Sequence, residues 1–268
     1  MMVSNMRKYF YIFKTELMSN LNYVFNILFT FIGYFIHILV FFYLWNYIYN
    51  DSSQIINGYS KGQMIWYVII TEVIWSVLVG RSFCRKISED VKSGNITYNL
   101  NKPYSYIGYL LSSKLGEMSI SFVLYFIGAI ILGLLFIGKL PSIDIIQFII
   151  VLISCLLACI ISVFLIICIG LFAFYIEDTG PFYWIYSKII LIFGTIFPIE
   201  FFPGILRGIL SYSPIYVVSY GPAKLFVNFN YIDSIKILVA QIIYIIITYL
   251  LCLLIYKKGE KRLNVNGG

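Results

Sequence analysis

The sequence predicts an all-α polytopic membrane protein, and three observations carry that prediction. Apolar residues make up 61% of the 268 residues and charged residues 12%, whereas a soluble domain is about half apolar and about a quarter charged. Six long apolar stretches lie between Asn22 and Tyr256. Basic residues gather in alternate gaps between these stretches. About 20 apolar residues suffice to cross a bilayer as a helix, so the six stretches leave no room for a separate soluble domain.

Residues 1–21 precede the first stretch and are expected to form an amphipathic helix. Apolar side chains recur at helical spacing from Met6 to Leu17, and basic residues fall elsewhere on the wheel. Such a helix can lie in the headgroup layer of the lipid bilayer. The alternative is a cytoplasmic helix that leads into the first span. No signal-peptide cleavage pattern follows the first stretch, so we interpret it as a retained span.

The six transmembrane helices are expected at residues 22–49, 63–83, 107–137, 145–176, 184–199 and 234–256, in a single transmembrane domain covering 1–268. Of the 19 Lys and Arg residues, 13 flank one side of these spans and five the other, with Lys188 counted on the richer side and Lys114 inside a span. Basic flanks stay cytoplasmic, which predicts a multi-pass membrane protein with both termini cytoplasmic. This topology explains the net charge of +7 better than nucleic-acid binding does. The high content of Ile, Asn, Lys and Tyr is typical of an AT-rich bacterial genome and indicates a bacterial plasma membrane.

Motifs of soluble active sites are missing from the sequence. There is no GxxxxGK[ST] phosphate-binding loop, and there is no HExxH or CxxC pattern. The five cysteines fall in or beside predicted spans and are interpreted as packing residues. The single histidine, His37, lies among apolar residues with no acid near it in the sequence, so it is expected to be packed and neutral. We therefore expect no catalytic site, no metal and no cofactor bound by this chain.

The loop at residues 84–106 has a mixed surface that suits a protein partner. Ser88, followed by two acids, is typical of a helix start, Gly94 of a helix end, and Pro103 precedes the third span. Ile87, Val91, Ile96 and Leu100 would form the apolar side of this short helix. A second, shorter turn at Glu177 and Asp178 is either a helix cap or a further partner contact.

The segment at residues 200–222 is rich in Pro and Gly, which interrupt helices. Unpaired backbone groups at membrane depth are tolerated only where protein buries them or water reaches them. We therefore expect a broken, re-entrant hairpin on the outer side before the last span, with an amphipathic extracellular loop as the alternative. The residues expected to form an outer gate are Pro198, Glu200, Pro203, Gly204 and Pro214.

Two acids within predicted spans are candidates for a transport pathway. A charge at the centre of a span costs about 2.5–3.5 kcal/mol on insertion scales. Glu117 lies three residues after Lys114, and the two side chains are expected to pair. Glu72 has no partner in its own span, so it should face another helix, a subunit interface or a wet cavity. A buried, protonated carboxyl group in a helix contact is the alternative for Glu72.

Two segments together resemble type-2 ABC exporter permeases. The pattern Ile-x-x-Asp-x-x-x-Gly-x-Ile-x-x-x-Leu-x-x-Pro at residues 87–103 is similar to the loop after the second span of that family. The segment at residues 199–214, with Gly221-Pro222 after it, resembles the family's broken hairpin. The resemblance covers nearly the whole chain.

The resemblance implies a subunit without an ATPase site of its own. It would form the translocation pathway with a second copy or a sister permease, and separate ABC ATPase subunits would bind and use ATP. The loop after the second span would be the coupling helix, with Ile87 and Val91 as packing anchors, Glu89, Asp90 and Lys92 as polar contacts, and Gly94 at its end. An ion- or proton-coupled secondary transporter is the alternative function, and an intramembrane enzyme would need more clustered acids and histidines than the spans contain. The sequence does not indicate the substrate.

Overall fold

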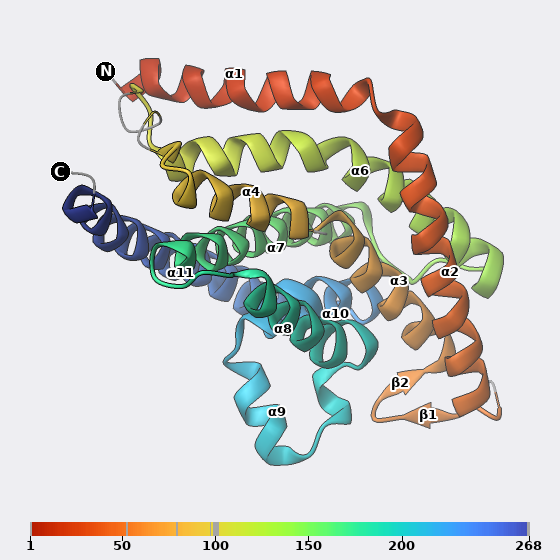
Figure 1. Ribbon diagram of the computed structural model, residues 1–268. Helices are drawn as coiled ribbons and strands as arrows, with labels where there is room; N and C mark the ends of the chain where they lie inside the picture. Colours follow the sequence, from red (N-terminus) through yellow and green to blue (C-terminus); the bar gives the residue numbers. More distant parts are fainter. Residues whose placement is uncertain (1, 52, 79, 97, 99–101, 267–268) are drawn as a thin grey trace.

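The protein is a bundle of helices with one two-stranded hairpin (Figure 1). The computed structural model describes all residues except 1, 52, 79, 97, 99–101, 267 and 268. The α-helices are α1 (Met2–Leu21), α2 (Val24–Ile48), α3 (Lys61–Val77), α4 (Arg81–Lys92), α6 (Tyr106–Ile137), α7 (Ile145–Leu171), α8 (Gly180–Ile190), α9 (Gly204–Ser211), α10 (Gly221–Val227) and α11 (Tyr231–Asn266). The hairpin consists of β1 (Ile55–Ile56) and β2 (Tyr59–Ser60), which pair antiparallel. Short 3-10 or π turns are η1 (Phe172–Phe174), η2 (Leu191–Ile196), η3 (Ile199–Phe201) and η4 (Tyr216–Tyr220).

Within the described residues, five helical stretches are long and apolar enough to cross a bilayer. They are Phe25–Ile48, Lys61–Lys92, Tyr106–Ile137, Ile145–Phe174 and Tyr231–Arg262. The prediction of an all-α polytopic membrane protein is therefore confirmed. The fifth expected span, 184–199, corresponds to a shorter apolar helix at Gly180–Ile196, which is formed by α8 and η2.

Local sequence explains where the long helices begin and end. The Ser60 hydroxyl accepts from the backbone N–H of Gln63 at 3.4 Å, and the Gln63 side chain accepts from the backbone N–H of Ser60 at 3.0 Å. This reciprocal cap begins α3 directly after the hairpin. Ser105 caps α6 in a similar way by accepting from the backbone N–H of Gly108 at 3.1 Å. Gly138 ends α6 because its φ of +79° places it in the left-handed region.

Helix α1 lies lengthwise along the first half of α6 (Figure 1). The Tyr9 hydroxyl is 3.1 Å from the Ser105 hydroxyl, and the Ser113 hydroxyl donates to the Glu16 carboxylate at 2.9 Å. At Gly116 an added Cβ would lie 2.4 Å from the carbonyl oxygen of Phe13, so glycine allows the two backbones to approach. The chain then bends into α2. One face of α1 is thus covered by protein, while Met6 and Phe10 are exposed.

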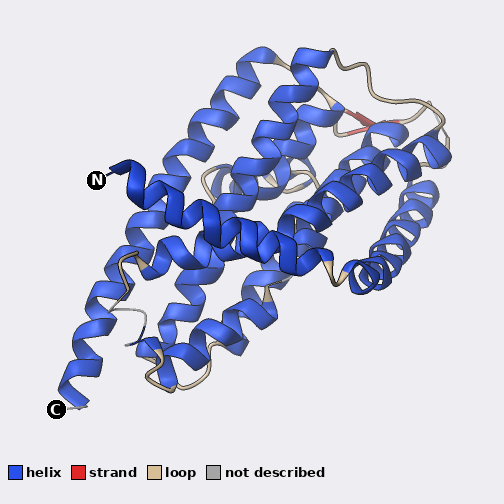
Figure 2. Ribbon diagram, turned by 90° about the horizontal axis from the view of Figure 1, so that it is seen from above, coloured by secondary structure: helices blue, strands red, loops and turns tan. Residues whose placement is uncertain are grey.

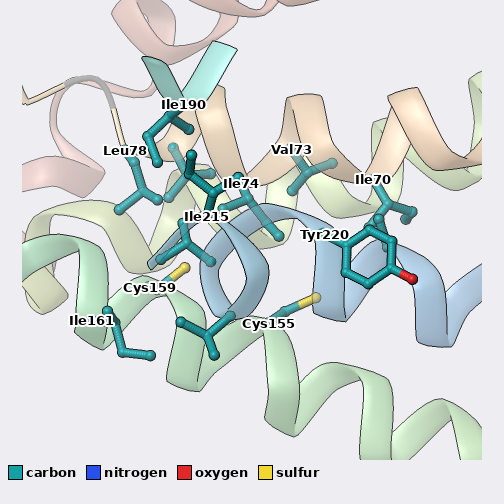
Figure 3. Close-up of a cluster of buried hydrophobic side chains, with 14 of the residues drawn as sticks. Ile70, Val73, Ile74, Leu78, Cys155, Cys159, Ile161, Ile190, Ile215 and Tyr220 are labelled. Carbon is teal, nitrogen blue, oxygen red and sulfur yellow. The ribbon is translucent and has the colours of Figure 1, made fainter. Parts of the chain in front are cut away.

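Helix α3 is the centre of the core. All of its residues from Met64 to Ile74 are buried. Figure 3 shows Ile70, Val73 and Ile74 of α3 above Cys155 and Cys159 of α7, with Ile190, Ile215 and Tyr220 in the same cluster. The five cysteines are buried and unbridged, which agrees with their predicted packing role.

Both chain ends lie on one side of the bundle, and the hairpin lies on the opposite side (Figures 1 and 2). These two sides are called the terminal side and the hairpin side below. Between α8 and α11 the chain passes back into the bundle. The Tyr244 hydroxyl in the middle of α11 donates to the carbonyl oxygen of Tyr212, and Gln241 donates to the carbonyl oxygen of Val217 at 2.8 Å. At the end of α10 the carbonyl oxygen of Val227 accepts from Gln63 at 3.2 Å, which returns the chain to the hairpin side.

Candidate functional site

On the terminal side, α4 presents a row of charged side chains. Arg85 and Glu89 form an ion pair at 2.7 Å while their side chains remain 79% and 61% exposed. Lys92 is also exposed. Asp90 is half-buried, and its carboxylate accepts from the Tyr106 hydroxyl at 3.0 Å. Of the three predicted polar contacts, Glu89 and Lys92 therefore face outward, and Asp90 ties α4 to α6.

The structure corrects the roles expected for Ile87 and Val91. Both side chains are buried within this chain, at 0% and 3% exposure, so neither is accessible to a partner. Ile87 sits against Gly170 of α7, where an added Cβ would lie 2.8 Å from the Cβ of Ile87. The two residues are packing anchors, but they hold α4 on α7. The spacing of Ile87 and Val91 correctly predicted that one face of α4 is buried. It did not show whether this chain or a partner buries that face.

The boundaries of α4 differ in part from the prediction. The helix begins at Arg81, so Ser88 lies inside it and is not a helix start. Gly94 follows the end of α4 with a φ of +74°, and this confirms its predicted role as a helix end. Ile96 is buried, as expected, and Leu100 lies outside the described residues.

A groove separates α4 from the turn that leads into α8. It encloses about 380 Å³ and is lined by Arg81, Cys84, Arg85, Ser88, Glu89, Lys92, Asp178, Thr179, Gly180 and Tyr183. A second hollow of about 420 Å³ continues past Lys92 to Tyr175 and Glu177. The Asp178 carboxylate accepts from the backbone N–H of Gly180 at 2.9 Å, so it caps α8. The Asp178 side chain also lines the groove. It can therefore bond the start of α8 and still belong to a surface that a partner contacts.

A polar cavity of about 340 Å³ opens between α2, α3 and α6. Glu117 lines it and pairs with Lys114 at 2.8 Å, as the spacing predicted. Lys114 is 2% exposed, and its ammonium lies 5.5 Å from the centre of the Phe83 ring. The remaining polar residues that line the cavity are Asn20, Asn26, Thr30, Tyr34, His37, Ser76, Ser121 and Tyr125.

Glu72 lies beside the same cavity, against His37. The carboxylate of Glu72 is fully buried, and its Oε2 lies 3.6 Å from Nδ1 of His37. Neither carboxylate oxygen accepts a hydrogen bond from the residues that the structure describes. The expectation that His37 is packed and has no acidic partner is therefore wrong, because its side chain is 58% exposed and faces Glu72. The two predicted pathway acids, Glu72 and Glu117, are brought to one region, since His37 and Glu117 both line the cavity.

On the hairpin side, the carboxylate of Glu200 is the centre of a hydrogen-bonded cluster. Oε2 accepts from the Tyr59 hydroxyl at 3.2 Å, and Oε1 accepts from the Tyr220 hydroxyl and from Lys224 at 3.3 Å. These four residues come from β2, η3, η4 and α10. Burial, together with the neighbouring Glu200 carboxylate, raises the pKa of Tyr59 above the ordinary tyrosine value. The Tyr59 hydroxyl therefore remains a donor at physiological pH.

The other residues expected at an outer gate flank the short helices η3, α9 and η4 along the chain. Pro198 precedes η3, and Pro203 precedes α9, whose first residue is Gly204. Pro214 stands between α9 and η4. No local pattern indicates Tyr59, Tyr220 or Lys224 as site residues, because their partner Glu200 is 141, 20 and 24 residues away.

Comparison with known proteins adds the family. No curated protein matches the chain. A family model described as ABC-2 family transporter protein matches residues 35–267, which is most of the chain and includes α3, α4 and every helix after them. Members of this family are transmembrane components of ABC transporters and typically pair with an ATPase subunit. This chain belongs to the ABC-2 transporter family and is a membrane-embedded permease component of an ABC transporter.

Proposed function

We propose that this chain forms the translocation pathway of an ATP-driven exporter, as a dimer with a second copy or a sister permease. Separate ATPase subunits would dock on the groove between α4 and the start of α8. The observation that carries this proposal is the exposure of Arg85, Glu89 and Lys92 on a helix whose opposite face is anchored to α7. A push on such a helix would reach the bundle, because Ile87 packs directly against Gly170 of α7. ATP would be bound by the partner and not by this chain.

The proposed topology has six spans in a plasma membrane, with the terminal side cytoplasmic. The apolar helix Gly180–Ile196 would be the fifth crossing, and α1 would lie at the cytoplasmic membrane surface. The placement of both termini on one side supports an even number of crossings. The basic flanks support the orientation.

The segment at residues 200–222 would be a re-entrant hairpin that closes the outer end of the pathway. The path of the chain supports this proposal. From the cluster at Glu200 the chain runs to Tyr212, whose carbonyl oxygen accepts from Tyr244 in the middle of α11, and then to Val227, whose carbonyl oxygen accepts from Gln63. Pro198, Pro203, Gly204 and Pro214 would interrupt the helices where the chain reverses. Opening the gate would require the hydrogen bonds of Glu200 to exchange.

Co-purification of the ATPase from native membranes in mild detergent tests the docking site. We expect a stoichiometric ATPase subunit with the wild-type chain and its loss from the Arg85→Glu, Lys92→Glu double variant. Lys236→Glu is the matched control, because it reverses an exposed charge near the start of α11 on the hairpin side. If the double variant retains the ATPase as well as the wild-type chain does, the ATPase does not dock on this groove. A wild-type chain recovered alone, under conditions that preserve a known ABC complex, would contradict the exporter.

A proton- or ion-coupled secondary transporter is the second candidate, and the His37–Glu72 pair favours it. Ionisable groups buried within spans are typical of proton pathways. Transport by a complex with a catalytically inactive ATPase distinguishes the two. An exporter loses transport, whereas a secondary transporter retains it and responds to a pH gradient. In the exporter, Glu72→Gln is expected to change export kinetics. Export kinetics that match the wild type across pH would show that Glu72 has only a packing role.

A further inference from the structure

A second cavity, separate from the polar one, lies between α3, α7, α8 and η4. It encloses about 240 Å³. Trp75, Tyr183, Trp184 and Tyr186 supply aromatic walls, and the apolar residues lining it are Ile74, Leu78, Ile190 and Val218. Ligand cavities in proteins are mostly apolar, with a few polar groups that fix orientation. This composition fits the apolar part of a small molecule.

The charged residues that line this cavity have one sign. Arg81 and Lys188 both line it, and no acidic residue does. Within the described part of the chain, neither cation forms an ion pair; the Lys188 ammonium lies 6.0 Å from the centre of the Trp184 ring, and its charge also acts on His37. Glu72 does not line the cavity, and its carboxylate faces His37. Asp178 lines the adjacent groove and caps α8.

Lys188 lies within an apolar helix and, among the described residues, forms no ion pair with an acid. Its charge is counted with the basic flanks, although it lies inside the expected span 184–199, and in the structure it is the ninth residue of the apolar helix Gly180–Ile196. Nine residues of helix rise about 13 Å, which takes Lys188 well into the bundle. A lysine within a span is costly unless it meets an anion or water. The side chain of Lys188 is exposed and lines the cavity, so a ligand can reach it.

We propose that this cavity binds an amphipathic anion. Its apolar ring or acyl chain would lie among the aromatic walls, and its carboxylate, phosphate or sulfate would meet Lys188 and Arg81. Such a molecule comes either from the bilayer, as a resident anionic lipid, or from the transported cargo. Only its role as cargo rests on the proposed function, since binding requires no ATPase.

Photolabelling with a matched probe pair tests the charge preference. The probes are diazirine-bearing C16 chains that end in a carboxylate or in a trimethylammonium group, applied to the full chain in nanodiscs. Adducts are mapped by mass spectrometry at residues 180–190 and, as the lipid-facing reference, at 242–251 of α11. We expect the carboxylate probe to enrich the cavity over the reference by about fivefold relative to the cationic probe, as one ion pair provides. Equal enrichment by both probes would overturn the proposal.

Substitutions at Lys188 and Arg81 test whether the preference for the anionic probe arises in this cavity. Lys188→Gln and Arg81→Gln should each lower the anion enrichment, and Lys188→Glu should reverse the preference toward the cation. Lys236→Gln removes an exposed lysine from the other end of the bundle and should change nothing. An anion preference that survives both Lys188→Gln and Arg81→Gln would also overturn the proposal. Lys188→Gln keeps a polar side chain of similar length, so it remains informative if the charge reversal prevents folding.

Two further measurements separate the sources of the ligand. Retention of anionic phospholipid by the purified chain, displaced by the carboxylate probe, identifies a resident lipid. Stimulation of ATP hydrolysis by the carboxylate probe in the reconstituted complex identifies cargo. Both results support an anion site. If no ATPase co-purifies but the carboxylate probe labels the cavity, the exporter proposal is contradicted and the anion site is supported. If an ATPase co-purifies but the cavity shows no anion preference, only the anion site is contradicted.

Discussion

The two charged regions at opposite ends of the bundle are built in different ways. On the terminal side, Arg85, Glu89 and Lys92 are exposed, and the ion pair between Arg85 and Glu89 joins residues four apart in one helix. On the hairpin side, the Glu200 carboxylate has three donors from three other elements. Exposed pairs contribute roughly 0–1 kcal/mol to stability, whereas a partly buried carboxylate loses more when its donors are removed. The first region is therefore suited to external contact and the second to internal restraint.

The largest expected effect breaks the support beneath the first region. Gly170→Val places a branched side chain where even a Cβ would lie 2.8 Å from Ile87. Overpacking of this kind costs about 3 kcal/mol. We expect a lower midpoint of thermal unfolding and loss of the co-purified ATPase, because α4 is displaced from α7. Gly204→Val is the control, since an added Cβ at Gly204 meets no atom within 4 Å. A Gly170→Val protein with wild-type stability would show that α4 is not held by this contact.

The second prediction compares the two regions directly by neutralising one acid in each. Glu200→Gln removes the charge that faces Lys224 and the two tyrosines, at a cost of about 2 kcal/mol. Glu89→Gln removes an exposed charge and should change stability by less than about 0.5 kcal/mol. Thermal unfolding of both variants in one detergent measures the difference. Equal shifts would remove the distinction between restraint and contact surface.

Within the cluster, a smaller effect than that of Glu200→Gln is expected at a single hydroxyl. Tyr59→Phe deletes one donor to Glu200 and should cost about 1 kcal/mol. Because the pKa of Tyr59 is raised, the folded protein keeps the hydroxyl protonated where an unfolded tyrosine ionises. The stabilisation is thus fully present below about pH 10 and declines above it. Unfolding measured at several pH values between 7 and 10 should give a constant difference between Tyr59→Phe and wild type. A difference that vanishes within this range would mean that the hydroxyl loses its proton early.

The features that sequence predicted well are local ones. The long spans follow from apolar runs, the end of α4 from Gly94, and the Lys114–Glu117 pair from a spacing of three residues. The features it missed join distant segments. His37 and Glu72 meet across two helices, and Tyr59 and Glu200 are 141 residues apart. A periodic pattern gives the buried face of a helix such as α4, but only the tertiary arrangement shows that Ile87 packs on Gly170.

The seating of α1 on α6 imposes an order on biosynthesis. Ser113, which donates to Glu16, is synthesised 97 residues later. At ribosomal rates of about 5–20 residues per second, the first helix waits roughly 5–20 s for its partner. During that interval Glu16 has no access to the Ser113 hydroxyl, and the site at Gly116 that accommodates the Phe13 carbonyl does not yet exist. The N-terminal helix is therefore completed only after the third long span is in place, so protease protection of α1 reports how far the nascent chain has assembled.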